Sequence, residues 1–344
     1  MNDPPSNPAI TRLSGELLVR AVSRMMPGTG PHRRTTAEQF LTGCRKAGLD
    51  LSRAFGLVET AQGREPWVRQ ACLAVPGPGR TAMLLVTGPI GRGGEREQDL
   101  ADRAAVIDAA GASCSPPEIV LAQALPSAEE AWAVDAYRRS GFEHVGDLAY
   151  LERAMEVADR GLPQPHWPEG VAARAMASLE HSSGDRADLH IALEASYEGT
   201  LDCPRLCGLR ATEDIIDSHQ ATGVFDPTNW LLLTEQGEPI GCSLVSLVPE
   251  TSSAELVYLG LAPAARGRGL AKQLLSASLR VAAHASCQRI VCAVDRRNTP
   301  AWALYKNAGF REFSARVAFV SNRSGASHAA SGSVMKHGRA VDRS

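Results

Sequence analysis

The hydrophobic pattern is clearest in the second half of the chain, where it predicts an alternation of strands and helices. Residues 254–261 and residues 289–294 are almost continuously apolar, which is typical of strands that are covered on both faces. Between them, residues 270–285 repeat apolar side chains at helical spacing. A strand, a helix and a second strand in this order predict a parallel crossover within one sheet.

Further elements are expected on both sides of this crossover. Thr299 can cap a helix whose first turn accommodates Pro300, and Gly309 suits the left-handed end of the same helix. The remaining predictions are helices at residues 186–197 and 212–219, strands at 230–234 and 239–248, and a last strand at 312–320. Together these elements predict an α/β fold with a mixed sheet.

The chain is expected to hold two domains of the same fold. Residues 136–142, which end in Gly-Phe, resemble residues 304–310, which lie 168 positions later. A Pro-rich segment at residues 161–168 is typical of an extended linker. The predicted segments are a disordered start (1–10), a first domain (11–157), the linker (158–169), a second domain (170–320) and a disordered tail (321–344).

Composition narrows the functional class. The 36 Lys and Arg residues and 38 Asp and Glu residues give a formal net charge of −2, so no nucleic-acid partner is expected. No stretch approaches the ~20 apolar residues that cross a bilayer, and the N-terminus lacks signal-peptide features, so we expect a cytoplasmic protein without a membrane partner. Of the eight cysteines, only Cys203 and Cys207 are close together, so no metal site is expected. The oligomeric state is left open.

The turn inside the predicted crossover has the features of an anion site. It reads Arg266-Gly267-Arg268-Gly269 and opens directly into a helix, whose first amides have no partner within the helix. The two glycines allow a phosphate to approach the backbone, and the two arginines offer charged donors. The turn lacks the Gly-Lys-Ser/Thr of a P-loop, and Lys272 stands where a dinucleotide fingerprint needs a third glycine.

This turn resembles the acyl-CoA loop of the GCN5-related N-acetyltransferase (GNAT) family, whose R/Q-x-x-G-x-G/A motif matches residues 266–271. Residues 259–263 are similar to that family's strand into the loop, and residues 298–301 and 304–310 are similar to its second signature. The likeness is strong over residues 254–320 and looser over residues 170–253 and 54–155. The resemblance implies two tandem GNAT domains, with acetyl-CoA as the cosubstrate.

The resemblance also implies roles for individual residues. The backbone of Leu259 and Leu261 would pair with the pantetheine arm, and the Leu261 N–H could polarise the thioester carbonyl. Asn298 would hydrogen-bond the cofactor near its reactive end, and Tyr305 would protonate the leaving thiolate. The pyrophosphate would be held by the amides of Arg266, Gly267, Arg268, Gly269, Leu270 and Ala271. An amine of a small molecule or a peptide would attack the thioester directly, without an acyl-enzyme, and the acceptor itself is left open.

The general base is the least defined part of this chemistry. A primary amine with a pKa near ~10 is mostly protonated at neutral pH and must lose a proton before it attacks. Many members of the family carry Glu partway along the strand, where this chain has Val257 and Tyr258. The open alternatives are Glu255 acting through water, a residue from the segment 186–219, and bulk solvent.

The N-terminal domain is expected to be a degenerate, non-catalytic copy. Its Gly91–Gly94 loop precedes a helix predicted at Glu95 to Glu97, whose carboxylates would repel a pyrophosphate. Glu130 stands at the position equivalent to Asn298. The leading hypothesis is an N-acetyltransferase that is active in its second domain. The alternatives are a catalytically silent acyl-CoA-binding sensor or scaffold and, less favoured, a protein that binds a nucleotide phosphate.

Overall fold

The computed structural model describes residues 9–26, 32–60, 63, 65–90 and 96–322. Both ends of the chain that we expected to be disordered fall largely outside these residues. The first strand already begins at Ile10, and the last one continues to Asn322. The loop Gly91–Gly94 and Glu95 also lie outside the described residues, and the helix that follows them begins at Glu97.

The first half of the chain contains four helices and six strands among its described residues. The helices are α1 (Gly15–Met25), α2 (His32–Lys46), α3 (Glu97–Ala112) and α4 (Ala131–Arg139). The strands are β1 (Ile10–Arg12), β2 (Ala54–Glu59), β3 (Trp67–Gly77), β4 (Thr81–Val86), β5 (Leu121–Ala124) and β6 (Glu143–Ala154).

The second half follows after a short 3₁₀ helix at Val157–Gly161 and confirms every helix and strand predicted there, with ends shifted by two residues or fewer. Its helices are α5 (Gly184–Tyr197), α6 (Thr212–Gln220), α7 (Leu270–His284) and α8 (Thr299–Asn307). Its strands are β7 (Val171–Ala175), β8 (Trp230–Glu235), β9 (Glu238–Val248), β10 (Ser253–Leu261), β11 (Arg289–Asp295) and β12 (Arg311–Asn322). Short 3₁₀ turns lie at Pro204–Leu206, Pro227–Asn229, Pro249–Thr251 and Pro263–Ala265.

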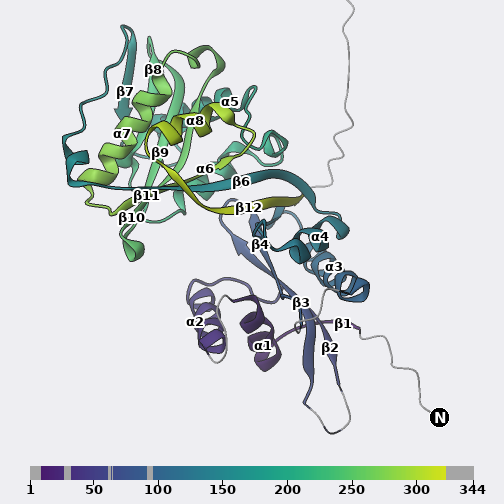
Figure 1. Cartoon of the computed structure of the whole chain (residues 1–344). Coiled ribbons are helices and arrows are strands. Elements are labelled where there is room, and N and C mark those ends of the chain that lie inside the picture. Colours follow the sequence, from purple (N-terminus) through teal and green to yellow (C-terminus); the bar gives the residue numbers. More distant parts are fainter. Residues whose placement is uncertain (1–8, 27–31, 61–62, 64, 91–95, 323–344) are drawn as a thin grey trace, which may run out of the picture.

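All twelve described strands form one continuous mixed sheet, in the order β1-β2-β3-β4-β5-β12-β6-β11-β10-β9-β8-β7. Two neighbouring pairs are parallel, β4 with β5 and β10 with β11. The predicted parallel crossover through α7 is therefore confirmed, and the first half repeats it through α3. Figure 1 shows the two lobes that result, with β6 and β12 running between them.

The two halves exchange their last strands. β6 ends the first half of the chain, yet it pairs with β11 of the second half from Ala154 to Leu148. In return, β12 pairs with β5 and with β6. Ala149 and Leu151 of β6 consequently belong to the core beneath α7 and α8, whereas Phe319 of β12 belongs to the core of the first half. Each half thus needs a strand from the other to complete its sheet.

Helices cover both faces of the sheet in the second half. α7 and α8 pack on one face, where Leu275, Leu279 and Tyr305 join one core cluster. α5 and α6 pack on the other face, in the cluster that holds Leu189 and Ile216. The neighbouring residues Leu244 and Val245 of β9 fall in these two different clusters, as expected from the alternation of side chains along a strand.

Candidate active site

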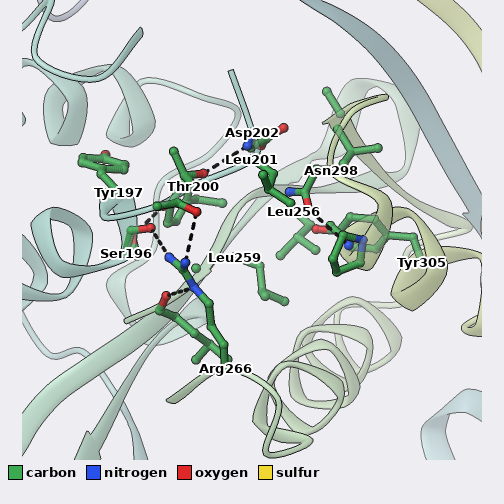
Figure 2. A pocket seen from close by; sticks show the side chains of 18 of the residues that line it. Ser196, Tyr197, Thr200, Leu201, Asp202, Leu256, Leu259, Arg266, Asn298 and Tyr305 are labelled. Carbon is green, nitrogen blue, oxygen red and sulfur yellow. Dashed lines mark hydrogen bonds between the residues drawn. The ribbon is translucent and has the colours of Figure 1, made fainter. Parts of the chain in front are cut away.

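The site begins where two parallel strands separate. β10 and β11 pair only over Ser253–Glu255, and beyond that point no pairing joins them. The register of β10 against β9 shifts between Leu256 and Tyr258, so Val257 forms a bulge that bends the strand. A cavity of about 250 Å³ opens between the separated strands and is lined by both of them, by the end of α5 and by α8. Figure 2 shows the side chains around it.

The backbone of Leu259 and Leu261 faces this opening. The N–H of Ala262 donates to the carbonyl of Ile240 on β9, so Ala262 points its backbone groups toward β9. Backbone groups along a strand alternate in direction, and those of Leu261 and Leu259 therefore point away from β9. Both residues line the cavity. An extended ligand lying beside β10 could pair with the backbone of Leu259 and with the N–H of Leu261, whose carbonyl accepts from Arg266 at 3.0 Å.

The turn after β10 is open at its two glycines. Gly267 and Gly269 have φ values of +74° and +79°, in the left-handed region that favours glycine, and a Cβ at either would meet no atom within 4 Å. Gly269 caps α7 without a side chain, and the first turn of α7 carries no acidic residue. Leu270 is buried in the core and fixes the start of the helix. The amides of Leu270 and Ala271 belong to a first helical turn, which is suited to a phosphate.

The two arginines of the turn are engaged within the protein, which the sequence did not indicate. The Arg266 guanidinium donates to the carbonyls of Leu261 (3.0 Å), Ser196 (2.9 Å) and Glu198 (2.8 Å), and to that of Gly199 at 3.2 Å. Arg268 forms an ion pair with Glu235 at 2.6 Å, and this pair lowers the pKa of the Glu235 carboxyl. Arg266 therefore connects the predicted cofactor turn to the C-terminal end of α5.

Asn298 and Tyr305 lie together on the side of the cavity formed by α8. The predicted cap of this helix, Thr299, is instead its first residue. Asn298 is the cap, because its side-chain oxygen accepts from the N–H of Ala301 at 3.3 Å. The Tyr305 ring is 6% exposed, and its hydroxyl has no hydrogen-bond partner among the described residues. Burial raises the pKa of Tyr305 well above its usual range, so the phenol stays protonated at neutral pH. Both residues line the cavity, as the predicted roles require.

Glu255 occupies a different position. It is the last residue of β10 that still pairs with β11, and it does not line the cavity. Its neighbours Ala254 and Leu256 belong to the core on the α7 and α8 face, so Glu255 points to the opposite face. Burial raises the pKa of its carboxyl, and its charge also acts on Tyr150 of β6. A water molecule would have to connect this carboxylate to the cavity.

Sequence reasoning missed the loop that follows α5. Ser196, Thr200, Leu201 and Asp202 line the cavity opposite α8. Only the segment 186–219, named as one possible source of a base, had included them. No periodicity or motif marks this loop, because its position depends on contacts with Arg266 and with the end of β11.

The comparisons with known proteins agree with this geometry. A family model described as "Acetyltransferase (GNAT) family" matches residues 193–310. A mycothiol acetyltransferase of Clavibacter sepedonicus is 28% identical over 274 residues, which cover 75% of this chain and 86% of that protein. Another, from a Nocardioides species, is 30% identical over 207 residues, covering 53% of this chain and 65% of that protein.

Solved structures show the same fold along the whole chain. A GCN5-related N-acetyltransferase from Sphaerobacter thermophilus has a TM-score of 0.58 at 19% identity and covers 93% of this chain and 97% of its own. A tandem GNAT protein from the clavulanic acid biosynthesis pathway has a TM-score of 0.51 at 14% identity and covers 92% and 99%. These likenesses extend the fold assignment to the N-terminal half, which the family model does not reach.

A mixed sheet opened between two parallel strands, with a glycine turn leading into a helix beside the opening, is the arrangement that the resemblance to acyl-CoA-dependent acyltransferases predicts. Residues 193–310 match the GNAT family model, and the comparisons support an acetyltransferase with acetyl-CoA as its cosubstrate. The chain's two-part arrangement resembles that of mycothiol synthase. The match favours an enzyme over the silent sensor or scaffold. Within the described residues, no helix has both the length and the apolarity to cross a membrane.

Proposed function

We propose that the second half of the chain transfers an acetyl group from acetyl-CoA to a primary amine of a small molecule. One observation carries this proposal. β10 and β11 separate after Glu255, and the exposed backbone of Leu259 and Leu261 leads directly to the open turn at Gly267 and Gly269. A pantetheine arm paired with β10 would therefore deliver its diphosphate to the start of α7.

The diphosphate is assigned to the backbone amides of residues 267–271 rather than to arginine side chains. The amide of Arg266 is left out of this set, because its N–H donates to the carbonyl of Pro263 at 3.1 Å. The Arg266 guanidinium already donates hydrogen bonds to four carbonyl groups, and Arg268 is paired with Glu235. The amides at the start of α7 and the partial positive charge of the helix N-terminus supply the complementary field.

In the proposed reaction, the amine nitrogen attacks the thioester carbonyl carbon. The Leu261 N–H stabilises the negative charge that develops on the oxygen. The C–N bond forms, the C–S bond breaks, and the CoA thiolate takes a proton from the Tyr305 hydroxyl. The acylated nitrogen releases its surplus proton to solvent, and the Tyr305 phenolate regains a proton from solvent. A phenol with a raised pKa is a fully protonated donor at neutral pH, and no partner among the described residues competes for its proton. The Asn298 amide would orient the cofactor near this point.

Glu255 is the proposed proton acceptor, reached through water. It lies at the closed end of the strand separation, and burial raises its pKa above the usual range, which makes it a stronger base than an exposed carboxylate. The amine would lose its proton to this water chain before or during attack.

The acceptor compounds to test first are chosen from the names of the similar proteins. Mycothiol acetyltransferases are among the proteins that match this chain over most of their length. We therefore place small-molecule amines before peptides. The unacetylated amine precursor of mycothiol belongs in the first set to be assayed.

The test is an assay of free CoA thiol release from acetyl-CoA in the presence of a panel of primary amines. The expected result is amine-dependent release for at least one small-molecule amine, with the acetylated amine detected by mass spectrometry. The same protein without amine gives the background hydrolysis. Tight acetyl-CoA binding without amine-dependent release across the panel, mycothiol precursor included, would contradict the proposed activity.

A further inference from the structure

The loop between α5 and the 3₁₀ turn at Pro204–Leu206 places a carboxylate in the reaction cavity. Asp202 lines the same cavity as Asn298 and Tyr305. Figure 2 shows Leu201 and Asp202 on one side of the cavity and Asn298 and Tyr305 on the other. Asp202 is exposed to solvent, yet enough protein surrounds its carboxyl that burial raises its pKa. An acidic side chain thus lines the cavity that the proposed reaction uses.

The loop that carries this carboxylate is fixed from two sides. Arg266 holds its beginning through the carbonyls of Glu198 and Gly199, and the N–H of Asp295 at the end of β11 donates to Asp202 Oδ1 at 2.7 Å. The Asp202 N–H donates to the Thr200 hydroxyl at 3.1 Å. The position of the carboxylate is therefore set by the glycine turn after β10, through Arg266, and by the end of β11.

The carboxylate lacks a cation. Among the described residues, no Lys, Arg or His side chain forms an ion pair with Asp202, and Oδ2 accepts no hydrogen bond. The nearest arginine in sequence, Arg297, is paired with Asp295 at 2.6 Å and donates to the carbonyl of Val145. Protein around this carboxyl raises its pKa and so disfavours its charged form, and a cationic ligand would offset that effect.

We infer that Asp202 binds the ammonium group of the acceptor and thereby selects cationic amines for acetylation. The inference rests on the proposed function. A primary amine with a pKa near ~10 arrives protonated at neutral pH, so its positive charge complements the unpaired carboxylate. The ion pair brings the nitrogen into the cavity beside the acetyl group, and the proton then leaves through the water chain to Glu255. Alcohols and other uncharged nucleophiles gain nothing from Asp202.

The same ion pair affects the proton that the amine must lose. An opposite charge nearby favours the charged form, so Asp202 raises the pKa of the bound amine. The other ionisable groups that act on Asp202 or are acted on by it are Asp295, Arg297, Cys203, Tyr258, Cys292 and Tyr305. Of these, the cysteines and tyrosines have raised pKa values and stay neutral, and Asp295 and Arg297 form a pair. The bound amine therefore responds chiefly to Asp202.

The variant Asp202→Asn separates charge from structure. An asparagine oxygen can still accept from the N–H of Asp295, so the loop keeps its hydrogen bond while the negative charge is lost. With the amine that turns over fastest in the panel, we expect KM to rise ~10-fold, because the variant loses the charge attraction for the ammonium group. The ascending limb of the kcat profile should move to lower pH, because the bound amine is no longer held in its charged form.

A purely structural role for Asp202 would leave KM and the pH profile of the Asn variant unchanged, and that result would overturn the inference. Acetyl-CoA affinity, measured by calorimetry, should be equal in the two proteins. If wild-type protein turns over amines while Asp202→Asn behaves identically, the inference fails and the proposed function stands.

A binding measurement covers the case in which no amine in the panel turns over. n-Butylammonium chloride is titrated into protein saturated with CoA, with n-butanol as the uncharged counterpart. We expect the ammonium probe to bind wild-type protein at least ~10-fold more tightly than Asp202→Asn, and the alcohol to show no such difference. Equal binding of n-butylammonium to both proteins would overturn the inference independently of catalysis.

Discussion

Equivalent tyrosines in the two halves have opposite surroundings. Tyr137 on α4 and Tyr305 on α8 pack in the same way against the phenylalanine that follows their helix, with ring centroids 5.5 and 5.4 Å apart. The Tyr137 hydroxyl, however, donates to the carbonyl of Leu84 on β4 at 3.0 Å, in a fully buried position. The Tyr305 hydroxyl faces the cavity without a partner among the described residues.

The two tyrosines lie at equivalent places, where a pair of parallel strands separates. β4 and β5 also pair over only three residues, Thr81–Met83, and then separate as β10 and β11 do. In the first half, the Tyr137 hydroxyl donates to the carbonyl of Leu84, the residue that follows the last paired residue of β4. The first turn of α3 also carries Glu97 and Asp99, where α7 carries no acidic residue. The N-terminal half thus keeps the architecture but uses its polar groups internally, which supports the prediction that it is non-catalytic.

The first prediction asks whether the halves can exist apart. A chain starting at residue 158 lacks β6, so β11 loses the partner that pairs with it from Arg289 to Asp295. Ala149 and Leu151 also leave the core beneath α7 and α8. We expect this fragment to show no cooperative thermal unfolding by circular dichroism. A fragment starting at residue 140, which keeps β6, serves as the control. Equal folding of both fragments would show that strand exchange is dispensable.

The second prediction concerns the start of α7, which has no acidic residue in its first turn, unlike the start of α3 in the N-terminal half. In Gly269→Asp, the new carboxylate would cap the amides at the start of α7 and repel the diphosphate. Two charges ~4 Å apart near a protein surface interact by about 4 kcal/mol, so acetyl-CoA affinity should fall roughly 100- to 1,000-fold. Calorimetry measures this affinity.

Gly48→Asp is the matched control for this substitution. Gly48 has a φ of +71° and open space around a Cβ, so it imposes the same backbone strain in the N-terminal half. Its substitution should leave acetyl-CoA affinity unchanged. A similar loss in both variants would assign the effect to general strain rather than to a diphosphate site.

The third prediction tests the tyrosine contrast through catalysis. Tyr305→Phe removes the proposed proton donor, and kcat should fall about 100-fold, in the range that general acid catalysis supplies. The dissociation constant of acetyl-CoA should change little, because the ring remains in its core cluster. Tyr137→Phe should keep full kcat. Unaltered turnover in Tyr305→Phe would remove the tyrosine from the proposed chemistry.

The fourth prediction concerns the pH dependence that Glu255 should impose. Burial raises the pKa of Glu255, so kcat/KM should rise with pH as the carboxyl loses its proton at a pH above its usual range. Glu255→Gln should lower kcat/KM by about 10-fold or more and flatten that acidic limb. Persistence of the limb in the glutamine variant would assign it to another group.

The sequence predicted the second half well because its signals are local. The apolar runs of β10 and β11, the Thr299-Pro300 start of α8 and the glycines of the turn each determine a short stretch of backbone. The matching helices α4 and α8 follow the predicted repeat, from Ala131–Arg139 to Thr299–Asn307.

What the sequence did not reveal depends on contacts between distant residues. The exchange of β6 and β12 is decided by pairing between strands more than 100 positions apart, and no local pattern encodes which partner a strand takes. Asp202 enters the cavity because Arg266 and Asp295 hold its loop. The structural use of Arg266 could not be separated from phosphate binding, since a guanidinium next to glycines suits either role.

The last prediction compares the stability effects of removing the two tyrosine hydroxyls, which should be the smallest effects of all. Tyr137→Phe removes a buried hydrogen bond and leaves the carbonyl of Leu84 without its donor, so the free energy of unfolding should fall by about 1–2 kcal/mol. Tyr305→Phe breaks no hydrogen bond to a described residue and should change stability by less than about 0.5 kcal/mol. Urea unfolding of both variants at neutral pH measures the difference. If Tyr305→Phe were the more destabilising of the two, its hydroxyl would have a structural partner in solution, and the contrast between the two halves would disappear.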